Sequence, residues 1–335
     1  MLKYKTQLIM LAAVTGLLGS SIFSAETWRL GDEGKWKTVS AEDKYLLEVS
    51  EIKKLVNMGE TTAVRKAVDK LKQDFPEAAG PELDAFLKAE ILYSRGKFTK
   101  AVWNYDKFLE KFPTSELYAA ALDRKFAIAT AYLGGQKKTV LGVFKIKGYA
   151  EGIKIMEKIS DQAGDAPIGL NAAVAVAQCY ERRGKFSEAY SKWSEISSRW
   201  PSGEPGKDSL LSMARCKFSG YKGPRYDGSG LVSARSYYED FKLRYPEDAE
   251  KIGVGETLSE VNEQIAYKEF STGEYYRKTG NEQSAKLYYQ MVVSGWPEST
   301  AAGMAKKAMS EEQSGAKKEI KWKEKIVNKI EKLLL

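Results

Sequence analysis

The sequence contains no histidine and only two cysteines in 335 residues. Without an imidazole, the chain cannot build a Ser-His-Asp or Cys-His catalytic arrangement or a histidine-ligated metal site. Its acidic residues lack the common spacing that paired catalytic carboxylates would show. The glycine-rich stretch 220–230, GYKGPRYDGSG, lacks the Lys-Ser/Thr ending of a phosphate-binding loop. We therefore expect a protein that is not an enzyme, with no catalytic, cofactor-binding or metal-binding residues.

Long apolar runs are also scarce, and the one clear example is Leu8–Leu18. It follows Lys3 and Lys5, is too short for an ordinary membrane-spanning helix, and precedes a cluster of small residues. These features predict a secretory signal peptide over residues 1–25, with its cleavage site left open; a retained N-terminal anchor is the alternative. No cysteine precedes Cys179. We expect an exported protein of the periplasm, at most peripheral at the outer membrane, and not a Cys-anchored lipoprotein.

Neither positive nor negative charge is concentrated in one segment of the chain before its lysine-rich C-terminal stretch. The net charge is +8, and basic and acidic residues alternate along the predicted helices. Mixed charges of this kind are typical of solvated helix faces and give no basic patch for nucleic acid, so we expect no nucleic-acid partner.

Proline is infrequent, but five of the nine prolines follow an aromatic residue at the end of a recurring segment. The stretch 96–113, GKFTKAVWNYDKFLEKFP, is the clearest copy, and related copies end at Pro76, Pro201, Pro246 and Pro297. In all but the copy ending at Pro246, a glycine opens the segment at the same distance from the proline. Glycine permits a tight turn into a helix, and proline prevents the helix from continuing.

The spacing inside each copy predicts one buried helix face. In four of the five copies an alanine stands twelve positions before the proline and an aromatic residue eight before it, which places both on the same face; the copy ending at Pro76 has Val64 and Val68 there. We predict these repeat-core residues to be Ala101, Tyr105, Ala189, Trp193, Ala234, Tyr238, Ala285 and Tyr289.

One helical hairpin cannot bury its apolar face alone, so several must stack. The Gly, Ala, aromatic and Pro spacing resembles the second helix of the tetratricopeptide repeat. The resemblance implies an all-α, right-handed solenoid of five to six hairpins. The expected organisation is an extended leader 26–40, N-terminal repeats 41–201 with an irregular insertion near 136–148, C-terminal repeats 205–310, and a basic amphipathic helix 317–335.

Two features of these segments leave alternatives open. Cys179 and Cys216 lie in consecutive hairpins, either as buried free thiols or as a disulfide between the hairpins. The 317–335 helix puts Trp322 on an apolar face among lysines. It could cap the solenoid, lie peripherally on an anionic membrane, or dock on a partner.

The run 258–300, together with RYDGSGLVSARSYYEDFKLRYPED before it, resembles the BamD family, the tetratricopeptide component of the outer-membrane β-barrel assembly machine. The resemblance is most specific over 205–310 and implies a periplasmic scaffold that binds other machine components or unfolded outer-membrane proteins. The alternatives are a general periplasmic adaptor in envelope or cell-division coordination, and a peptide- or glycan-binding partner of an enzyme.

In tetratricopeptide arrays the first helices of the hairpins line a concave groove. Projecting that pattern onto this chain predicts a set of partner-binding residues, although the same positions could instead pack on neighbouring hairpins or face water. The set consists of Phe86, Glu90, Tyr93, Gln178, Glu181, Arg182, Phe270, Glu274, Arg277 and Lys278.

Overall fold

The computed structural model describes residues 41–76, 80–140 and 144–311, the short segments 28–30 and 36–38, and the two tail residues Trp322 and Lys325. The signal peptide expected over 1–25 lies outside the described residues, as does most of the tail helix; Trp322 and Lys325 are both helical. The chain divides into two compact units, residues 1–152 and 153–335. We call them unit 1 and unit 2 and describe each by itself.

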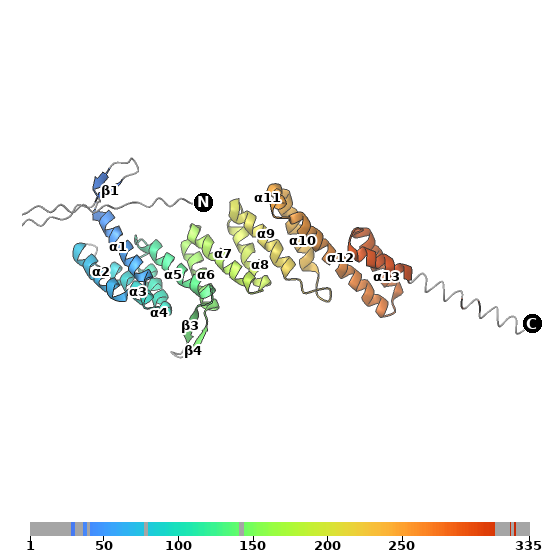
Figure 1. The fold of residues 1–335 in the computed structure, drawn as a ribbon, viewed down its shortest axis with the longest axis horizontal. Coiled ribbons are helices and arrows are strands. Elements are labelled where there is room, and N and C mark those ends of the chain that lie inside the picture. The colour runs from blue at the N-terminus through green and yellow to red at the C-terminus, as the bar shows by residue number, and fades with distance from the viewer. Residues whose placement is uncertain are drawn as a thin grey trace, which may run out of the picture. The chain divides into compact units, whose positions relative to one another are not determined.

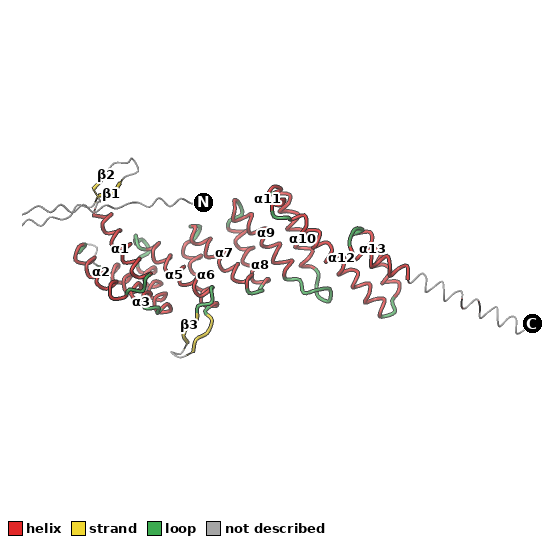
Figure 2. Tube along the Cα trace, in the orientation of Figure 1, coloured by secondary structure: helices red, strands yellow, loops and turns green. Residues whose placement is uncertain are grey.

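Unit 1 consists of helical hairpins followed by a small β-hairpin (Figure 1). α1 packs on α2, α3 packs on α4, and α4 packs on α5. Two antiparallel strand pairs accompany them, β1 with β2 in the expected extended leader and β3 with β4 in the expected insertion (Figure 2). The elements are β1 (Trp28–Leu30), β2 (Trp36–Thr38), α1 (Ala41–Asn57), α2 (Thr61–Asp74), α3 (Pro81–Ser94), α4 (Phe98–Lys111), α5 (Tyr118–Leu133), β3 (Lys137–Val140) and β4 (Phe144–Lys147).

Unit 2 continues the repeat pattern, and each of its helices from α7 onward packs mainly on its neighbours in sequence, as in a solenoid. α6 begins at the end of unit 1 and runs into unit 2. Residues 300–311 form a further helical segment after α13. The elements are α6 (Tyr149–Ala163), α7 (Pro167–Arg182), α8 (Phe186–Arg199), α9 (Gly203–Ser219), α10 (Ser229–Arg244), α11 (Pro246–Lys251), α12 (Val254–Lys278) and α13 (Glu282–Gly295).

The fold is therefore all-α in its repeats, as the sequence predicts, but the division between its parts falls elsewhere. We expected a boundary at 201–205, whereas the two units meet inside α6, at Gly152 and Ile153. The helices on either side of 201–205 share one apolar cluster, in which Trp193 of α8 lies with Met213 of α9. A shared core of this kind leaves no domain boundary there.

The buried seam of each hairpin depends on close approach of its two helices. All eight predicted core residues are buried, and the four alanines are fully so. In the last hairpin, a Cβ added to Gly273 of α12 would lie 2.8 Å from the Tyr289 ring of α13. The small residue on the first helix therefore leaves the space that the aromatic ring of the second helix fills.

Glycine and proline act at the ends of the helices as their chemistry requires. Gly59, Gly96, Gly184 and Gly280 adopt positive φ between 66° and 80°, a conformation that disfavours any residue with a Cβ. Each aromatic residue before a repeat proline is the C-cap of its helix, and its N–H donates to the carbonyl four residues earlier. Phe112, for example, donates to Phe108.

We expect Trp193→Ala to lower the free energy of unfolding by about 3–5 kcal/mol, because the ring is buried in the seam and its removal leaves a cavity. Trp103 of α4 provides a matched control, since its side chain is 55% exposed. Trp103→Ala should cost less than about 1 kcal/mol, mainly through the lost contact with the Lys107 ammonium above its ring. Chemical denaturation measures both, and similar costs for the two substitutions would contradict the seam at Trp193.

Candidate partner-binding surface

α12 exposes two large aromatic side chains. Tyr267 is 40% exposed and Tyr275 is 64% exposed. They are eight residues apart, which corresponds to about 12 Å along a helix and about 80° around its axis, so both lie on one broad side of α12. Lys278 lies on this side near the end of the helix and is also exposed.

Each exposed tyrosine is supported by a half-buried aromatic ring. The Phe270 ring lies 6.2 Å from that of Tyr267 and 5.7 Å from that of Tyr289 in the core. The Tyr276 ring lies 5.7 Å from that of Tyr275 and stacks on Tyr288 of α13 at 5.5 Å. These contacts hold the rings in place, so they lose little conformational freedom when a partner binds. We call Tyr267, Phe270, Tyr275, Tyr276 and Lys278 the α12 surface.

Glu274 links this surface to the core. Its Oε1 accepts a hydrogen bond of 2.6 Å from the Tyr289 hydroxyl, and Arg277 donates Nε and Nη2 to its two oxygens at 2.9 and 2.7 Å. The hydrogen bonds from Arg277, and then from Tyr289, lower the pKa of the Glu274 carboxyl. Burial is the main reason that the pKa of Tyr289 rises to about 12. Arg277 is therefore committed to a contact within α12, whereas Lys278 projects into solvent.

The connection between α9 and α10, residues 220–228, packs beside α12. The Lys268 ammonium donates a hydrogen bond of 2.8 Å to the Pro224 carbonyl. Burial raises the pKa of Tyr221 in this connection, with smaller effects from Glu269 and Tyr267 of α12. The connection also exposes Tyr226. The glycine-rich stretch thus borders the α12 surface.

The residues predicted on α7 divide between solvent and core. Gln178 and Arg182 are exposed. Glu181 accepts a hydrogen bond of 2.5 Å from Nε1 of Trp193 and one of 3.5 Å from the Cys216 thiol. Its carboxylate therefore stabilises the hairpin core, and the residue is only partly exposed to solvent.

Both cysteines are buried free thiols, and the disulfide alternative does not occur. Burial, followed by the negative charge of Glu181, raises the pKa of the Cys216 thiol to about 12. A thiol with a raised pKa forms little thiolate near neutral pH and is a poor nucleophile.

The prediction for α3 is wrong for Phe86 and Glu90, which are buried and cannot line an open groove. Phe86 packs between the rings of Tyr105 and Phe108 at 6.1 and 5.6 Å. Glu90 accepts a hydrogen bond of 2.5 Å from the Tyr105 hydroxyl and pairs with the Arg124 guanidinium at 2.9 Å.

The reason lies in α5, which packs beside this hairpin. Arg124 of α5 also donates a hydrogen bond of 3.0 Å to the Lys53 carbonyl of α1 and another to the Asn57 side chain. Its guanidinium lies 5.0 Å from the centre of the half-buried Tyr93 ring. Arg124 stands 34 residues after Glu90, which is one tetratricopeptide repeat length. That spacing of opposite charges is the signal in the sequence for this contact.

Within the part of the chain that the structure describes, no three His, Cys, Asp or Glu side chains lie close enough to hold a metal ion. None of the described helices is long and apolar enough to cross a membrane.

No family model matches the chain, and no curated protein matches it. Solved structures similar to it include PilW, a type IV pilus biogenesis factor, which is 15% identical over 79% of this chain and 99% of its own, with a TM-score of 0.29. The C-terminal part of a TPR repeat-containing protein from Cytophaga hutchinsonii is 14% identical over 80% and 88% of the two chains, with a TM-score of 0.38. A tetratricopeptide repeat protein from Parabacteroides merdae is 10% identical over 79% and 98%, with a TM-score of 0.32. These TM-scores are low, so the hairpin architecture rests on the chain's own helices and spacing.

We expect Glu90→Gln to lower the free energy of unfolding by about 3–5 kcal/mol, because it leaves the Arg124 guanidinium buried without its counter-charge. Removing both charges, with Glu90→Gln and Arg124→Met together, should cost less than the sum of the two single substitutions. Glu51 faces solvent 4.0 Å from Lys54, and Glu51→Gln should cost less than about 0.5 kcal/mol. Equal costs for Glu90→Gln and Glu51→Gln in urea denaturation would contradict the buried network.

We expect the Cys216 thiol to resist alkylation by iodoacetamide at pH 8 in the folded chain, measured in a Cys179→Ser background by mass spectrometry. Glu181→Gln should accelerate the reaction, because removing the neighbouring carboxylate lowers the thiol pKa. Folding favours the neutral thiol, so its contribution to the free energy of unfolding should be constant below pH 9.0, the ordinary pKa, and fall as the pH rises toward about 12. Rapid labelling of the native chain at pH 8 would overturn this assignment.

Proposed function

We propose that the chain is an exported tetratricopeptide scaffold that binds another protein through the α12 surface. The observation that carries the proposal is the pair of exposed tyrosines, Tyr267 and Tyr275, on one broad side of α12, each braced by a half-buried ring. Aromatic side chains of this kind commonly supply most of the binding energy at protein interfaces. Exposed aromatics on one side of a helix are costly in a surface that meets only water, which favours a protein that covers them.

We further propose that this partner belongs to the outer-membrane β-barrel assembly machine. The segments that resemble the BamD family, 258–300 and the stretch beginning at Arg225, include the α12 surface and part of the connection packed against it. The signal peptide expected at residues 1–25 supports a periplasmic location. The chain would reach the outer membrane through its partner or through its basic tail.

The test is a binding titration of the chain without residues 1–25 against the soluble periplasmic domains of the machine's central β-barrel protein from the same organism. Tyr275→Ala combined with Lys278→Glu should weaken binding at least about tenfold, because it removes one anchor and reverses one exposed charge. Arg277 is left intact, since its loss would disturb the Glu274–Tyr289 contact of the core.

Trp103→Ala combined with Lys107→Glu is the matched control, because it makes the same chemical changes on an exposed face of unit 1. We expect the control to bind as tightly as the unchanged chain. Equal weakening by both double variants would contradict the α12 surface. A lack of association of the unchanged chain at micromolar concentrations would contradict the proposed partner and favour a general periplasmic adaptor.

A further inference from the structure

Unit 1 contains a pocket that the proposed function does not use. Its volume is about 840 Å³, and it lies between the turn that joins α3 to α4 and the turn that joins α5 to β3. The lining residues are Gly96, Lys97, Phe98, Thr99, Lys100, Tyr132, Gly134, Gly135, Gln136 and Lys137. They include three lysines and no carboxylate.

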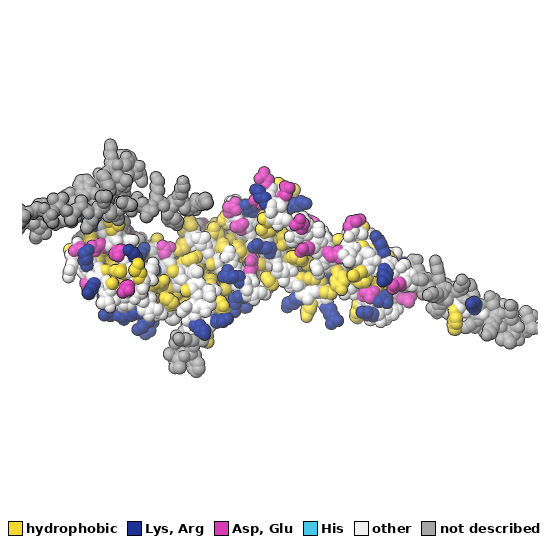
Figure 3. Space-filling model, viewed as in Figure 1, with side chains coloured by type: hydrophobic (Ala, Val, Ile, Leu, Met, Phe, Trp, Pro, Cys, Tyr) yellow, Lys and Arg dark blue, Asp and Glu magenta, His cyan; other side chains and the backbone are white. Residues whose placement is uncertain are grey.

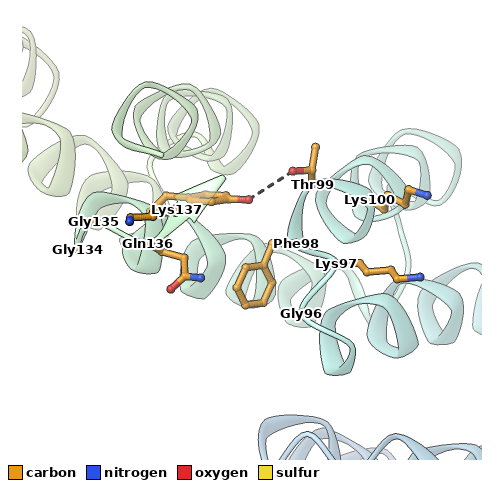
Figure 4. A pocket seen from close by; sticks show the side chains of 10 residues that line it. Gly96, Lys97, Phe98, Thr99, Lys100, Gly134, Gly135, Gln136 and Lys137 are labelled. Carbon is orange, nitrogen blue, oxygen red and sulfur yellow. Dashed lines mark hydrogen bonds between the residues drawn. The ribbon is translucent and has the colours of Figure 1, made fainter. Parts of the chain in front are cut away.

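The walls of the pocket are fixed by packing. Tyr132 is buried, and its ring lies 6.3 Å from Phe98 in an edge-to-face arrangement. Its hydroxyl shares a hydrogen bond of 3.4 Å with the Thr99 hydroxyl, drawn as the dashed line in Figure 4. A Cβ at Gly148, the residue after β4, would lie 2.2 Å from the Tyr132 ring, so the backbone there packs directly against this ring.

The lysines are exposed and come from two parts of the chain, on opposite sides of the pocket. In Figure 4, Lys97 and Lys100 lie on the α4 side and Lys137 lies on the opposite side, with Phe98 and Gln136 between them. The side chains of Lys97 and Lys100 are drawn extending away from Phe98, so the ammonium groups stand at the rim of the pocket. Within the described ranges, no ion pair involves any of the three, whereas the neighbouring Lys138 is paired with Glu151 at 2.6 Å. The lower edge of unit 1 as viewed in Figure 3 likewise shows Lys and Arg side chains, without Asp or Glu among the described residues drawn there.

Each of these positive charges is unfavourable for the backbone element that carries it. Lys97 is the N-cap of α4 and Lys100 lies in its first turn, which has no acidic residue and no side-chain cap. Cations at that end of a helix are unfavourable, because the helix dipole is positive there. Lys137 is also the direct cross-strand partner of Lys147, and like charges placed opposite each other destabilise a strand pair. An anion in the pocket would offset these unfavourable charges.

We infer that this pocket binds a phosphate group. Phosphate carries the charge that three lysines can neutralise and accepts hydrogen bonds from ammonium and hydroxyl donors. The Thr99 and Tyr132 hydroxyls supply the neutral donors at the wall. The phosphate has two potential sources, a soluble phosphorylated compound and an anionic lipid headgroup, and the experiment distinguishes them. The inference concerns unit 1 and does not depend on the partner proposed for the α12 surface.

The test uses the chain without residues 1–25 and two probes. Pyrophosphate binding is measured by calorimetry, and vesicle binding by co-sedimentation with phosphatidylglycerol mixed into phosphatidylcholine, with phosphatidylcholine alone as the neutral comparison. The triple variant Lys97→Gln, Lys100→Gln and Lys137→Gln should bind either probe at least about tenfold more weakly. High salt should weaken the binding of the probe by the unchanged chain. Without any ligand, the triple variant should melt at the same or a higher temperature, because like-charge repulsion has been removed.

The control removes the same charge elsewhere in unit 1, with Lys66→Gln, Lys107→Gln and Lys111→Gln at exposed positions. It should bind nearly as well as the unchanged chain. Thr99→Glu is a second test, because a carboxylate in the first turn of α4 favours the helix yet occupies the phosphate position. It should abolish binding without lowering the melting temperature.

Lysine-dependent binding of vesicles that contain phosphatidylglycerol would support the inference and assign a lipid source. Lysine-dependent binding of pyrophosphate without vesicle binding would support it and assign a soluble source. The inference is overturned if neither probe binds, or if the pocket variant and the control variant weaken binding equally.

Discussion

The close approach of two helices at a small residue is the constraint on which the repeats of this protein depend. Ala89, Ala177 and Gly273 stand on first helices, and the second helices bring Tyr105, Trp193 and Tyr289 to the same seams. The clash that a Cβ at Gly273 would make with Tyr289 shows how little space remains. A bulky residue at such a position would separate the helices and remove the packing that makes one hairpin stack on the next.

The same seam explains why residues expected to bind a partner often serve the core. In three hairpins a carboxylate of the first helix accepts a hydrogen bond from the aromatic ring that fills the seam: Glu90 from Tyr105, Glu181 from Trp193, and Glu274 from Tyr289. The polar end of each ring is thus satisfied although its body is buried. Substituting one of these glutamates would therefore lower the stability of its hairpin in addition to any effect on partner binding.

The surfaces available for function lie where the chain departs from the regular repeat. The long α9–α10 connection packs beside the exposed tyrosines of α12, and the β3–β4 hairpin after α5 adds a lysine to the pocket of unit 1. Regular hairpins supply rigid supports, whereas insertions are free to vary in length and side chains. This division of roles accounts for both proposed sites without requiring any catalytic group.

The sequence by itself determined the hairpins, because periodicity, positive-φ glycine and helix-ending proline act within a few residues of one another. It therefore specified the seam at Tyr105 and Tyr289 and the interruption near 136–148. Only the tertiary structure decided which first-helix residues remain exposed. Glu90 is buried because α5, one repeat later in the chain, places Arg124 against it. The lysine-lined pocket exists because the α3–α4 turn and the α5–β3 turn lie next to each other. Such contacts depend on how hairpins stack, and local spacing carries little information about that.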